Sequence, residues 1–126
     1  MTNNDITILI VTYKSDTILL KNLSFLKNFK VVLVDNFKES NLKDKITSYT
    51  NINYIKNNIN LGEGSGAKTG FELINSKYTL YLNPDTIINE VNIFKLKNIF
   101  LRYPDTGLLT PDDMLEVGGW LEAPVN

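Results

Sequence analysis

The sequence that decides the fold reads Ile6-Thr7-Ile8-Leu9-Ile10-Val11-Thr12. Consecutive apolar and β-branched side chains of this kind are typical of a strand that is buried on both faces. A second run, Val31-Val32-Leu33-Val34, ends abruptly at Asp35-Asn36. Between the two runs, after Ser15-Asp16, apolar residues follow helical spacing as far as Phe29. The chain therefore opens with strand, helix and strand, which is the unit from which parallel sheets are built.

The same alternation continues outward from these runs. Further strands are expected at 52–55, at 78–82 and from 108, and further helices at 40–49, 67–75 and 88–103. In the helix at 67–75, Phe71 and Ile74 are expected to face inward. Residues 57–66 contain three Asn and three Gly, which favours a loop with backbone freedom. Short connections between alternating strands and helices predict a three-layer α/β fold, with a mostly parallel sheet, in one domain over 1–126.

The composition excludes several classes of site. The chain has no Cys and no His, so a thiolate nucleophile, a zinc–thiolate site and an imidazole base are excluded. Its formal net charge of −1 gives no basic field for nucleic acid, and no nucleic-acid partner is expected. The apolar runs are too short to span a membrane and the start lacks a signal-peptide pattern. The expected location is the cytoplasm, with peripheral membrane contact left open.

Polar residues gather where the predicted strands end. They are Thr12-Tyr13-Lys14, Asp35-Asn36, the segment 57–66 and Asn83-Pro84-Asp85. In parallel sheets, ligands bind outside the carboxyl ends of the strands, at one shared edge. A carboxylate there can accept from a ribose hydroxyl, a glycine-rich turn can present N–H groups to phosphate, and Asp85 can hold Mg²⁺ or Mn²⁺. Together these residues predict a nucleoside diphosphate site, although each is by itself also an ordinary turn former.

One segment also matches a different phosphate site. Gly62-Glu63-Gly64-Ser65-Gly66-Ala67-Lys68-Thr69 follows the P-loop pattern GxxxxGK(S/T) except at Ala67, where that pattern requires Gly. The preceding strand is also weak, whereas a P-loop follows a strong first strand. A P-loop-like phosphate binder therefore stays as an alternative. Lys68 can contact phosphate in either case, and its plainer interpretation is an exposed helix residue.

In this order, the motifs resemble the family-two inverting glycosyltransferases with the GT-A fold, in the branch that includes bacterial rhamnosyltransferases. The resemblance covers about 6–111. It rests on Ile10-Val11-Thr12-Tyr13-Lys14-Ser15, Val32-Leu33-Val34-Asp35-Asn36, Asn60-Leu61-Gly62-Glu63-Gly64-Ser65-Gly66 with Gly70-Phe71, Tyr81-Leu82-Asn83-Pro84-Asp85-Thr86 and Pro104-Asp105-Thr106-Gly107-Leu108-Leu109-Thr110-Pro111. It implies transfer of a sugar from a UDP- or dTDP-sugar to a hydroxyl acceptor, in cell-surface polysaccharide synthesis.

The resemblance also assigns roles position by position. It places nucleotide contacts at Thr12, Tyr13, Asp35, Asn60, Gly62 and Asn83. Asn36, beside Asp35, and Lys68 are further nucleotide-contact candidates, although the family often has Asn or Arg at the positions of Ala67 and Lys68. It places the last carboxylate of a DxD-like motif at Asp85, which would ligate the Mg²⁺ or Mn²⁺ holding the sugar diphosphate, while Asn83 replaces the first Asp. Glu63 departs from the pattern, because the branch usually has an apolar residue there. This carboxylate would bring negative charge toward a bound diphosphate.

The acceptor half of the family, with its carboxylate general base, lies beyond the matched region. Asp112-Asp113 and Glu116 follow the predicted fifth strand too soon to supply that base, and Trp120 is expected to be a packing residue. The resemblance therefore covers the N-terminal nucleotide-binding half, leaves the catalytic residues unassigned and makes transfer by this chain alone less expected than binding. A homo-oligomer or a partner chain is expected to cover the missing half. A non-catalytic nucleotide-binding or partner-binding module is the remaining alternative.

Overall fold

The first apolar run forms the strand β1 (Ile6–Thr12), and all seven of its residues are buried. β1 pairs in parallel with β2 (Lys30–Asp35) on one side and with β4 (Tyr78–Leu82) on the other. β3 (Ile52–Lys56) pairs in parallel with β2, which gives a four-stranded sheet of order β3-β2-β1-β4. The prediction of a parallel α/β sheet is confirmed.

The computed structural model describes residues 5–103 and 105. The chain forms two compact units, Met1–Ile87 and Ile88–Asn126, and each is described by itself. The first unit contains the whole four-stranded sheet. The second contains α4 (Glu90–Arg102), whose first turn is capped because Asn89 Oδ1 accepts from Asn92 N at 2.9 Å. This helix agrees with the one predicted at 88–103, whereas the expected fifth strand from 108 and Trp120 lie outside the described residues.

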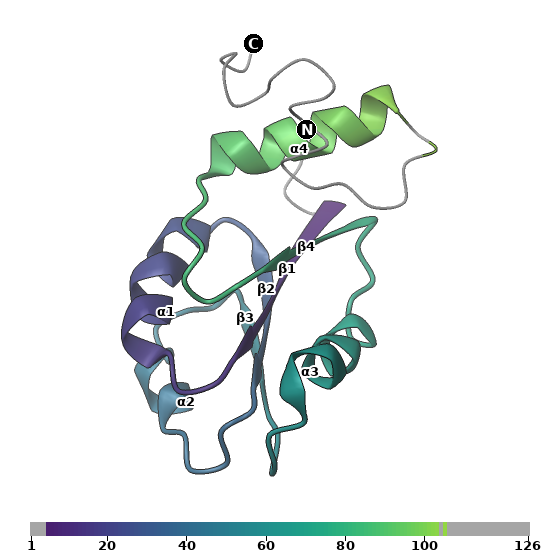
Figure 1. Cartoon of the computed structure of the whole chain (residues 1–126). Coiled ribbons are helices and arrows are strands. Elements are labelled where there is room, and N and C mark those ends of the chain that lie inside the picture. The colour runs from purple at the N-terminus through teal and green to yellow at the C-terminus, as the bar shows by residue number, and fades with distance from the viewer. Residues whose placement is uncertain (1–4, 104, 106–126) are drawn as a thin grey trace. The chain divides into compact units, whose positions relative to one another are not determined.

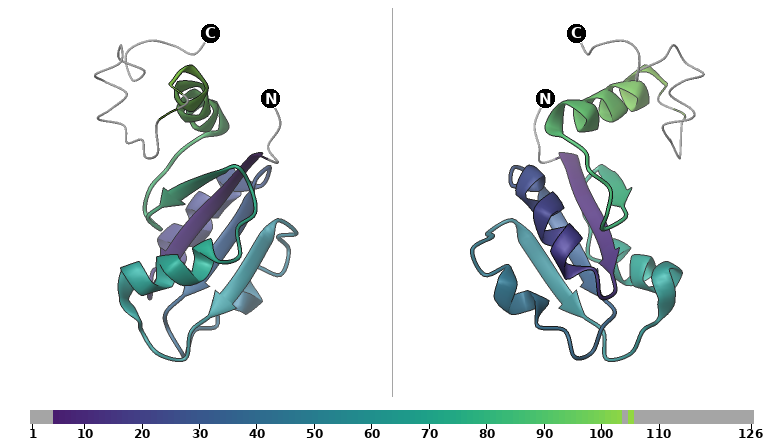
Figure 2. Two further views of the ribbon diagram at one scale, coloured as in Figure 1. Left: turned by 90° about the vertical axis from the view of Figure 1, so that its right-hand side faces the viewer. Right: turned by 60° about the vertical axis from the view of Figure 1, so that its left-hand side comes forward.

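Helices cover both faces of the sheet (Figures 1 and 2). α1 (Asp16–Leu23), which continues as a short 3₁₀ turn over Ser24–Leu26, lies on the same face as α2 (Leu42–Lys45). α3 (Gly62–Phe71) covers the opposite face. α1 presents the buried Leu19 and Leu23 to the interior, as its helical spacing predicts.

Two predictions about the glycine-rich segment are wrong. Gly62 begins α3, so 62–66 is not a loop, and the helix ends at Phe71 instead of continuing to 75. Phe71 is 49% exposed and does not face inward, whereas Ile74 packs against the core. α3 lies very close to the sheet at Gly66, where a Cβ would come within 2.8 Å of Val11 Cγ1, and at Gly70. A Cβ on Gly70 would collide with Leu9 Cδ1.

The polar helix expected at 40–49 is reduced to the four residues of α2. Leu42 and Ile46 are buried, as predicted for its apolar face, but Ile46 already lies beyond the last helical residue. The connection from β2 to β3 thus contains one helical turn, and the side chains of Leu42 and Ile46 pack it against the core. Isolated helical turns of this length depend on tertiary packing and not on propensity.

The strand register brings the carboxyl ends of the strands to one edge of the sheet. Thr12 is paired with Asp35 in the β1–β2 ladder, and Asp35 is paired with Lys56 in the β2–β3 ladder. In the β1–β4 ladder the last pair is Ile10 with Leu82, so β4 ends two residues before β1 does, at the same edge. The segments that follow Thr12, Asp35 and Leu82 therefore emerge side by side, at the edge where α/β proteins bind ligands.

Candidate nucleotide site at the carboxyl edge of the sheet

Asn36 joins three of the strand ends. Its backbone N–H donates to Thr12 O at 2.9 Å, at the end of β1. Its side-chain Nδ2 donates to Gly62 O at 3.0 Å, at the start of α3, and its Oδ1 accepts from Asn57 Nδ2 at 2.7 Å, just after β3. Because Asn36 is only 3% exposed, these hydrogen bonds lie in a largely desolvated position and fix the three segments relative to one another. The structure thus brings Thr12, Asn36 and Gly62 together, as predicted.

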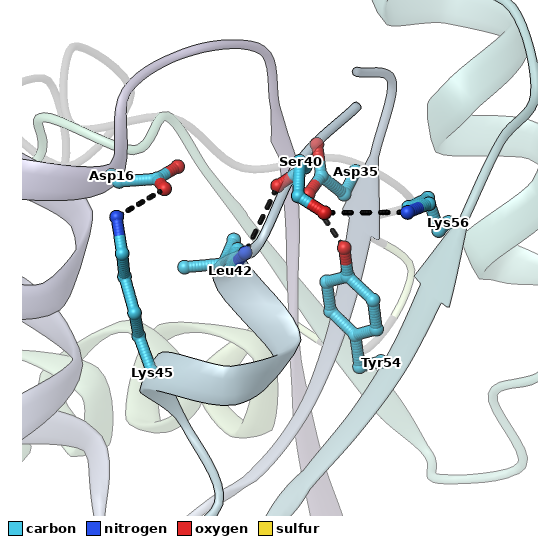
Figure 3. A network of polar contacts seen from close by, with 7 residues as sticks. All are labelled: Asp16, Asp35, Ser40, Leu42, Lys45, Tyr54 and Lys56. Atoms are coloured by element: carbon cyan, nitrogen blue, oxygen red, sulfur yellow. Dashed lines mark hydrogen bonds and ion pairs between the residues drawn. The ribbon is translucent and has the colours of Figure 1, made fainter. Parts of the chain in front are cut away.

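Asp35 is held inside the protein by two donors. Its Oδ1 accepts from Phe37 N at 3.1 Å and its Oδ2 accepts from Tyr54 OH at 2.6 Å. Figure 3 shows the Tyr54 hydroxyl reaching from β3 toward the end of β2. Burial, and then the hydrogen bond to Asp35, raise the pKa of Tyr54 above its usual value, so the phenol stays protonated and continues to donate. Because Asp35 is only 1% exposed, its carboxylate supports the site through these internal hydrogen bonds.

The turn after β1 displays an aromatic surface next to a cation. Tyr13 is 43% exposed, and its ring packs edge-on against Phe37 with 5.7 Å between the centroids. Lys14 Nζ lies 5.1 Å from the Tyr13 ring centroid and 4.9 Å from that of Phe37. Lys14 adopts a left-handed backbone, with φ of 55°, which turns the chain sharply out of the sheet. Tyr13 is therefore the predicted site residue that offers an accessible aromatic ring to a flat ligand.

An open groove of about 720 Å³ lies beside this aromatic surface. Its lining comes from the turn after β1, from α1 and from the connection between β2 and α2, and includes Lys14, Ser15, Asp16, Phe37, Ser40 and Asn41.

Hydrogen bonds brace the connection at Ser40, where Oγ accepts from Leu42 N at 3.1 Å and the carbonyl oxygen accepts from Lys56 Nζ at 3.3 Å (Figure 3). Lys45 also pairs with Asp16 at 3.0 Å across the two helices of this face. The wall of the groove is thus tied to β3 and to α1.

The start of α3 is built around Gly62 and Glu63. Gly62 has φ of +80°, and its N–H donates to Asn60 Oδ1 at 2.9 Å, so these two predicted site residues form one turn. Glu63 Oε1 accepts from Tyr81 OH at 2.6 Å, on β4. Burial, and then this hydrogen bond, raise the pKa of Tyr81 above its usual value. Glu63, which replaces the apolar residue usual in the resembling branch, therefore has Tyr81 as its hydrogen-bond partner.

The P-loop interpretation does not agree with this geometry. A P-loop wraps phosphate with a loop that precedes a helix, and its Lys follows that loop directly. Here 62–71 is helical throughout, and Lys68 lies exposed within α3. Within the described residues, the Lys68 ammonium makes no hydrogen bond and no ion pair. The structure therefore does not join Lys68 to the segments that Asn36 holds together.

The turn after β4 carries the predicted metal ligand. Asn83 and Asp85 are both exposed, and Thr86 N donates to Asn83 O at 3.0 Å, which closes the turn. The side chain of Asn22 in α1 donates to Pro84 O at 2.7 Å. Within the described residues, no group of three His, Cys, Asp or Glu side chains lies together. The protein thus offers Asp85 with a neighbouring amide oxygen, which suits Mg²⁺ or Mn²⁺ if diphosphate and water complete the coordination.

Comparison with known proteins decides the family. A family model described as glycosyl transferase family 2 matches residues 7–110. The chain belongs to glycosyl transferase family 2. Among solved structures, the crystal structure of S. aureus TarS 1–349 is similar, with a TM-score of 0.67 and 16% identity. The likeness covers 88% of this chain and 39% of TarS, so the chain spans well under half of that structure. At this identity it shows the fold, which is that of a GT-A glycosyltransferase.

Two further findings concern curated relatives and membrane-spanning helices. No curated protein matches it. Within the described residues, none of the helices combines the length and the apolar character that crossing a bilayer requires.

Four contacts of the candidate site were not predicted from the sequence. Tyr54 supports Asp35, Asn57 supports Asn36, Phe37 packs on Tyr13, and Asn22 bonds the turn after β4. The register that places Tyr54 near Asp35 cannot be read from a weak strand of five residues. Asn22 did carry a signal, because an amide stands on the apolar face of α1 between Leu19 and Leu23. A polar side chain at such a position needs a buried partner.

Proposed function

We propose that this chain binds the nucleoside diphosphate part of a nucleotide sugar, as the donor-binding half of a glycosyltransferase. The observation that carries the proposal is the convergence at Asn36, which joins the ends of β1, β2 and β3 to the start of α3. Family 2 membership over 7–110 supports the assignment of a nucleotide sugar to this edge. The proposed donors are UDP- or dTDP-sugars and the proposed product is a sugar on a hydroxyl acceptor of a cell-surface polysaccharide.

The proposed roles follow from exposure and position. The open face of Tyr13 supports the base, and the buried pair of Thr12 and Asp35 forms the wall behind it. The turn made by Asn60 and Gly62 borders the diphosphate. Asn36 acts by positioning these segments, because all of its described hydrogen bonds go to them. Lys68 keeps only a long-range electrostatic role in this proposal, since it lies along α3.

Asp85, with Asn83 beside it, is the proposed site for Mg²⁺ or Mn²⁺. A bound divalent cation would offset negative charge on the departing diphosphate. In the proposed inverting displacement, an acceptor hydroxyl oxygen forms a bond to the anomeric carbon as the bond from that carbon to the diphosphate oxygen breaks. A general base takes the hydroxyl proton. Asp35 and Glu63 each accept a hydrogen bond from a tyrosine, and the proposal assigns the base to neither of them.

Calorimetric titration tests the proposal. We expect UDP or dTDP to bind more tightly with Mn²⁺ than without it, and ATP to bind weakly in both conditions. Asp85→Asn should remove the gain from Mn²⁺, because it removes the one charged ligand of the turn. Glu72→Gln is the matched control. Glu72 is also an exposed acidic residue, but it lies at the C-terminal end of α3, whereas the proposed site includes the start of that helix.

The outcomes separate the alternatives. Nucleotide binding without sugar transfer in the presence of any acceptor would support the non-catalytic module. Absence of UDP and dTDP binding would contradict the proposal. A Mn²⁺ effect that survives Asp85→Asn would exclude Asp85 from the site while leaving nucleotide binding in place.

We further propose that a second copy of this chain or a partner chain contributes the acceptor side of the site. Sedimentation velocity tests this directly, and a stable monomer at high concentration would contradict it. The cytoplasm remains the proposed location and is tested by cell fractionation.

A further inference from the structure

We propose that Asn22 is a positioning residue that fixes the turn carrying Asp85, and so controls the affinity of the site for its divalent cation. The inference rests on the proposed function of Asp85. Asn22 lies in α1 and is 4% exposed, and its Nδ2 donates to Pro84 O at 2.7 Å across 62 residues of sequence. It is a long-range side-chain hydrogen bond between a buried helix position and the turn at 83–85.

The bond acts on Asp85 through the planarity of the peptide unit. Pro84 has no N–H, so its carbonyl is its only backbone hydrogen-bonding group. That carbonyl oxygen lies in one plane with the amide nitrogen and the Cα of Asp85. When Asn22 fixes the oxygen, it fixes the direction in which the chain enters Asp85. The exposed carboxylate is then carried on a backbone that is anchored to α1.

Little else in the described structure holds this turn. β4 ends at Leu82, one residue before it, and the turn itself is closed by the local bond from Thr86 N to Asn83 O. Asn83 and Asp85 are both exposed, so side-chain packing does not restrain them. Asn22 is therefore the buried anchor of the segment, and its loss should leave a turn that is restrained only locally.

The choice of residue at position 22 supports a specific role. Leu19 and Leu23 are buried on the same helix, so an apolar side chain at 22 would fit the face. Position 22 has an amide even though its Oδ1 is buried and has no partner within the structure described. A buried polar atom without a partner is unfavourable. The donor function of Nδ2 is the feature that leucine would lack.

Asn22→Leu tests the inference, because leucine has nearly the same size and no donor. We expect the gain in UDP affinity on adding Mn²⁺ to fall by about 10-fold, the order of one net hydrogen bond. UDP affinity without metal should be unchanged. The exchange of the Thr86 amide hydrogen, measured by NMR without any ligand, should become faster.

Asn51→Leu is the matched control. The Asn51 side chain also donates to backbone, to Leu26 O at 3.0 Å and Phe29 O at 2.8 Å. Asn51 precedes β3, so its bonds lie at the opposite edge of the sheet. This variant should lose thermal stability, keep the full gain from Mn²⁺ and leave Thr86 exchange unchanged. If Asn22→Leu does not fold, Asn22→Ser serves instead, because its hydroxyl is too short to reach Pro84 O.

The outcomes are decisive in each direction. A full Mn²⁺ gain in Asn22→Leu would overturn the inference. If the wild-type chain shows no Mn²⁺ gain, or if Asp85→Asn retains it, the proposed metal site fails by itself. In that case the Thr86 measurement judges Asn22: unchanged exchange contradicts the positioning role, and faster exchange supports it.

Discussion

Gly70 lies where α3 touches the sheet, and it has no room for a methyl group. A Cβ there would collide with Leu9 Cδ1 and come within 3.2 Å of Val34 Cγ2. We expect Gly70→Ala to lower the free energy of unfolding by about 1–3 kcal/mol, the usual cost of overpacking a core. Urea denaturation measures this change.

Gly64→Ala is the control for Gly70→Ala, because nothing lies within 4 Å of a Cβ at Gly64. Alanine is favoured over glycine in helices, so this variant should gain up to about 1 kcal/mol. Equal effects at the two positions would contradict the close approach of α3 to the sheet.

Tyr54 makes the stability of the fold depend on alkaline pH. Its pKa is raised by burial and by the hydrogen bond to Asp35, so the folded chain holds the phenol proton more tightly than the unfolded chain does. This contribution to stability is complete below about pH 10, the ordinary tyrosine value, and is lost as the pH rises above it. We expect Tyr54→Phe to flatten the fall in stability above that pH.

At neutral pH, Tyr54→Phe should cost about 1.5 kcal/mol, since Asp35 loses a donor. Chemical denaturation at a series of pH values measures both effects. Tyr49→Phe is the control, because among the described residues the Tyr49 hydroxyl makes no hydrogen bond. If the stability of Tyr54→Phe falls with pH just as that of the wild type does, the proposed role of the hydrogen bond between Tyr54 and Asp35 is contradicted.

At the scale of elements, α3 shows where prediction from sequence stops. The strands β1 and β2 could be predicted because an unbroken apolar run has few other interpretations. In 57–66, three Asn and the glycines at 62, 64 and 66 suggested a loop by local preference. Packing overrides that preference, because Gly66 and Gly70 are the positions at which the helix meets Val11 and Leu9. The sequence contains both signals, but only the tertiary structure decides between them.

The start of α3 depends on Gly62 for a different reason. Space around Gly62 is open, but its φ of +80° is unfavourable for residues with a Cβ. We expect Gly62→Ala to cost about 1–2 kcal/mol, and Gly62→Asn to cost less, because Asn tolerates the left-handed region. Urea denaturation of the two variants gives the comparison. The same cost for both would indicate that the turn with Asn60 has rearranged.

At the scale of the whole molecule, the sheet and the edge that carries the site could be predicted, whereas the internal support of the site could not. Thr12, Asn36 and Gly62 follow from strand ends in the sequence and meet in the structure. The contact between Tyr54 and Asp35 depends on strand register, and the bond from Asn22 to Pro84 on helix placement. Neither the strand register nor the placement of a helix against a turn can be read from a single sequence.

The site as a whole should bind metal and nucleotide together. The described residues contain no group of three metal-binding side chains, so Mn²⁺ alone has too few protein ligands. We expect Mn²⁺ alone to leave the melting temperature nearly unchanged, and Mn²⁺ with UDP to raise it more than UDP does alone. A large shift from Mn²⁺ alone would point to a metal site elsewhere in the chain.

The strand order has a consequence for the chain during synthesis. β1 lies between β2 and β4, so one of its edges stays unpaired until the ribosome has delivered residues 78–82. Until then, the nascent chain displays an apolar strand whose free edge can pair with the same strand of a neighbouring nascent chain. Translation that halts between β3 and β4 should therefore yield aggregates, whereas a chain that has released Leu82 can pair β4 with the free edge of β1.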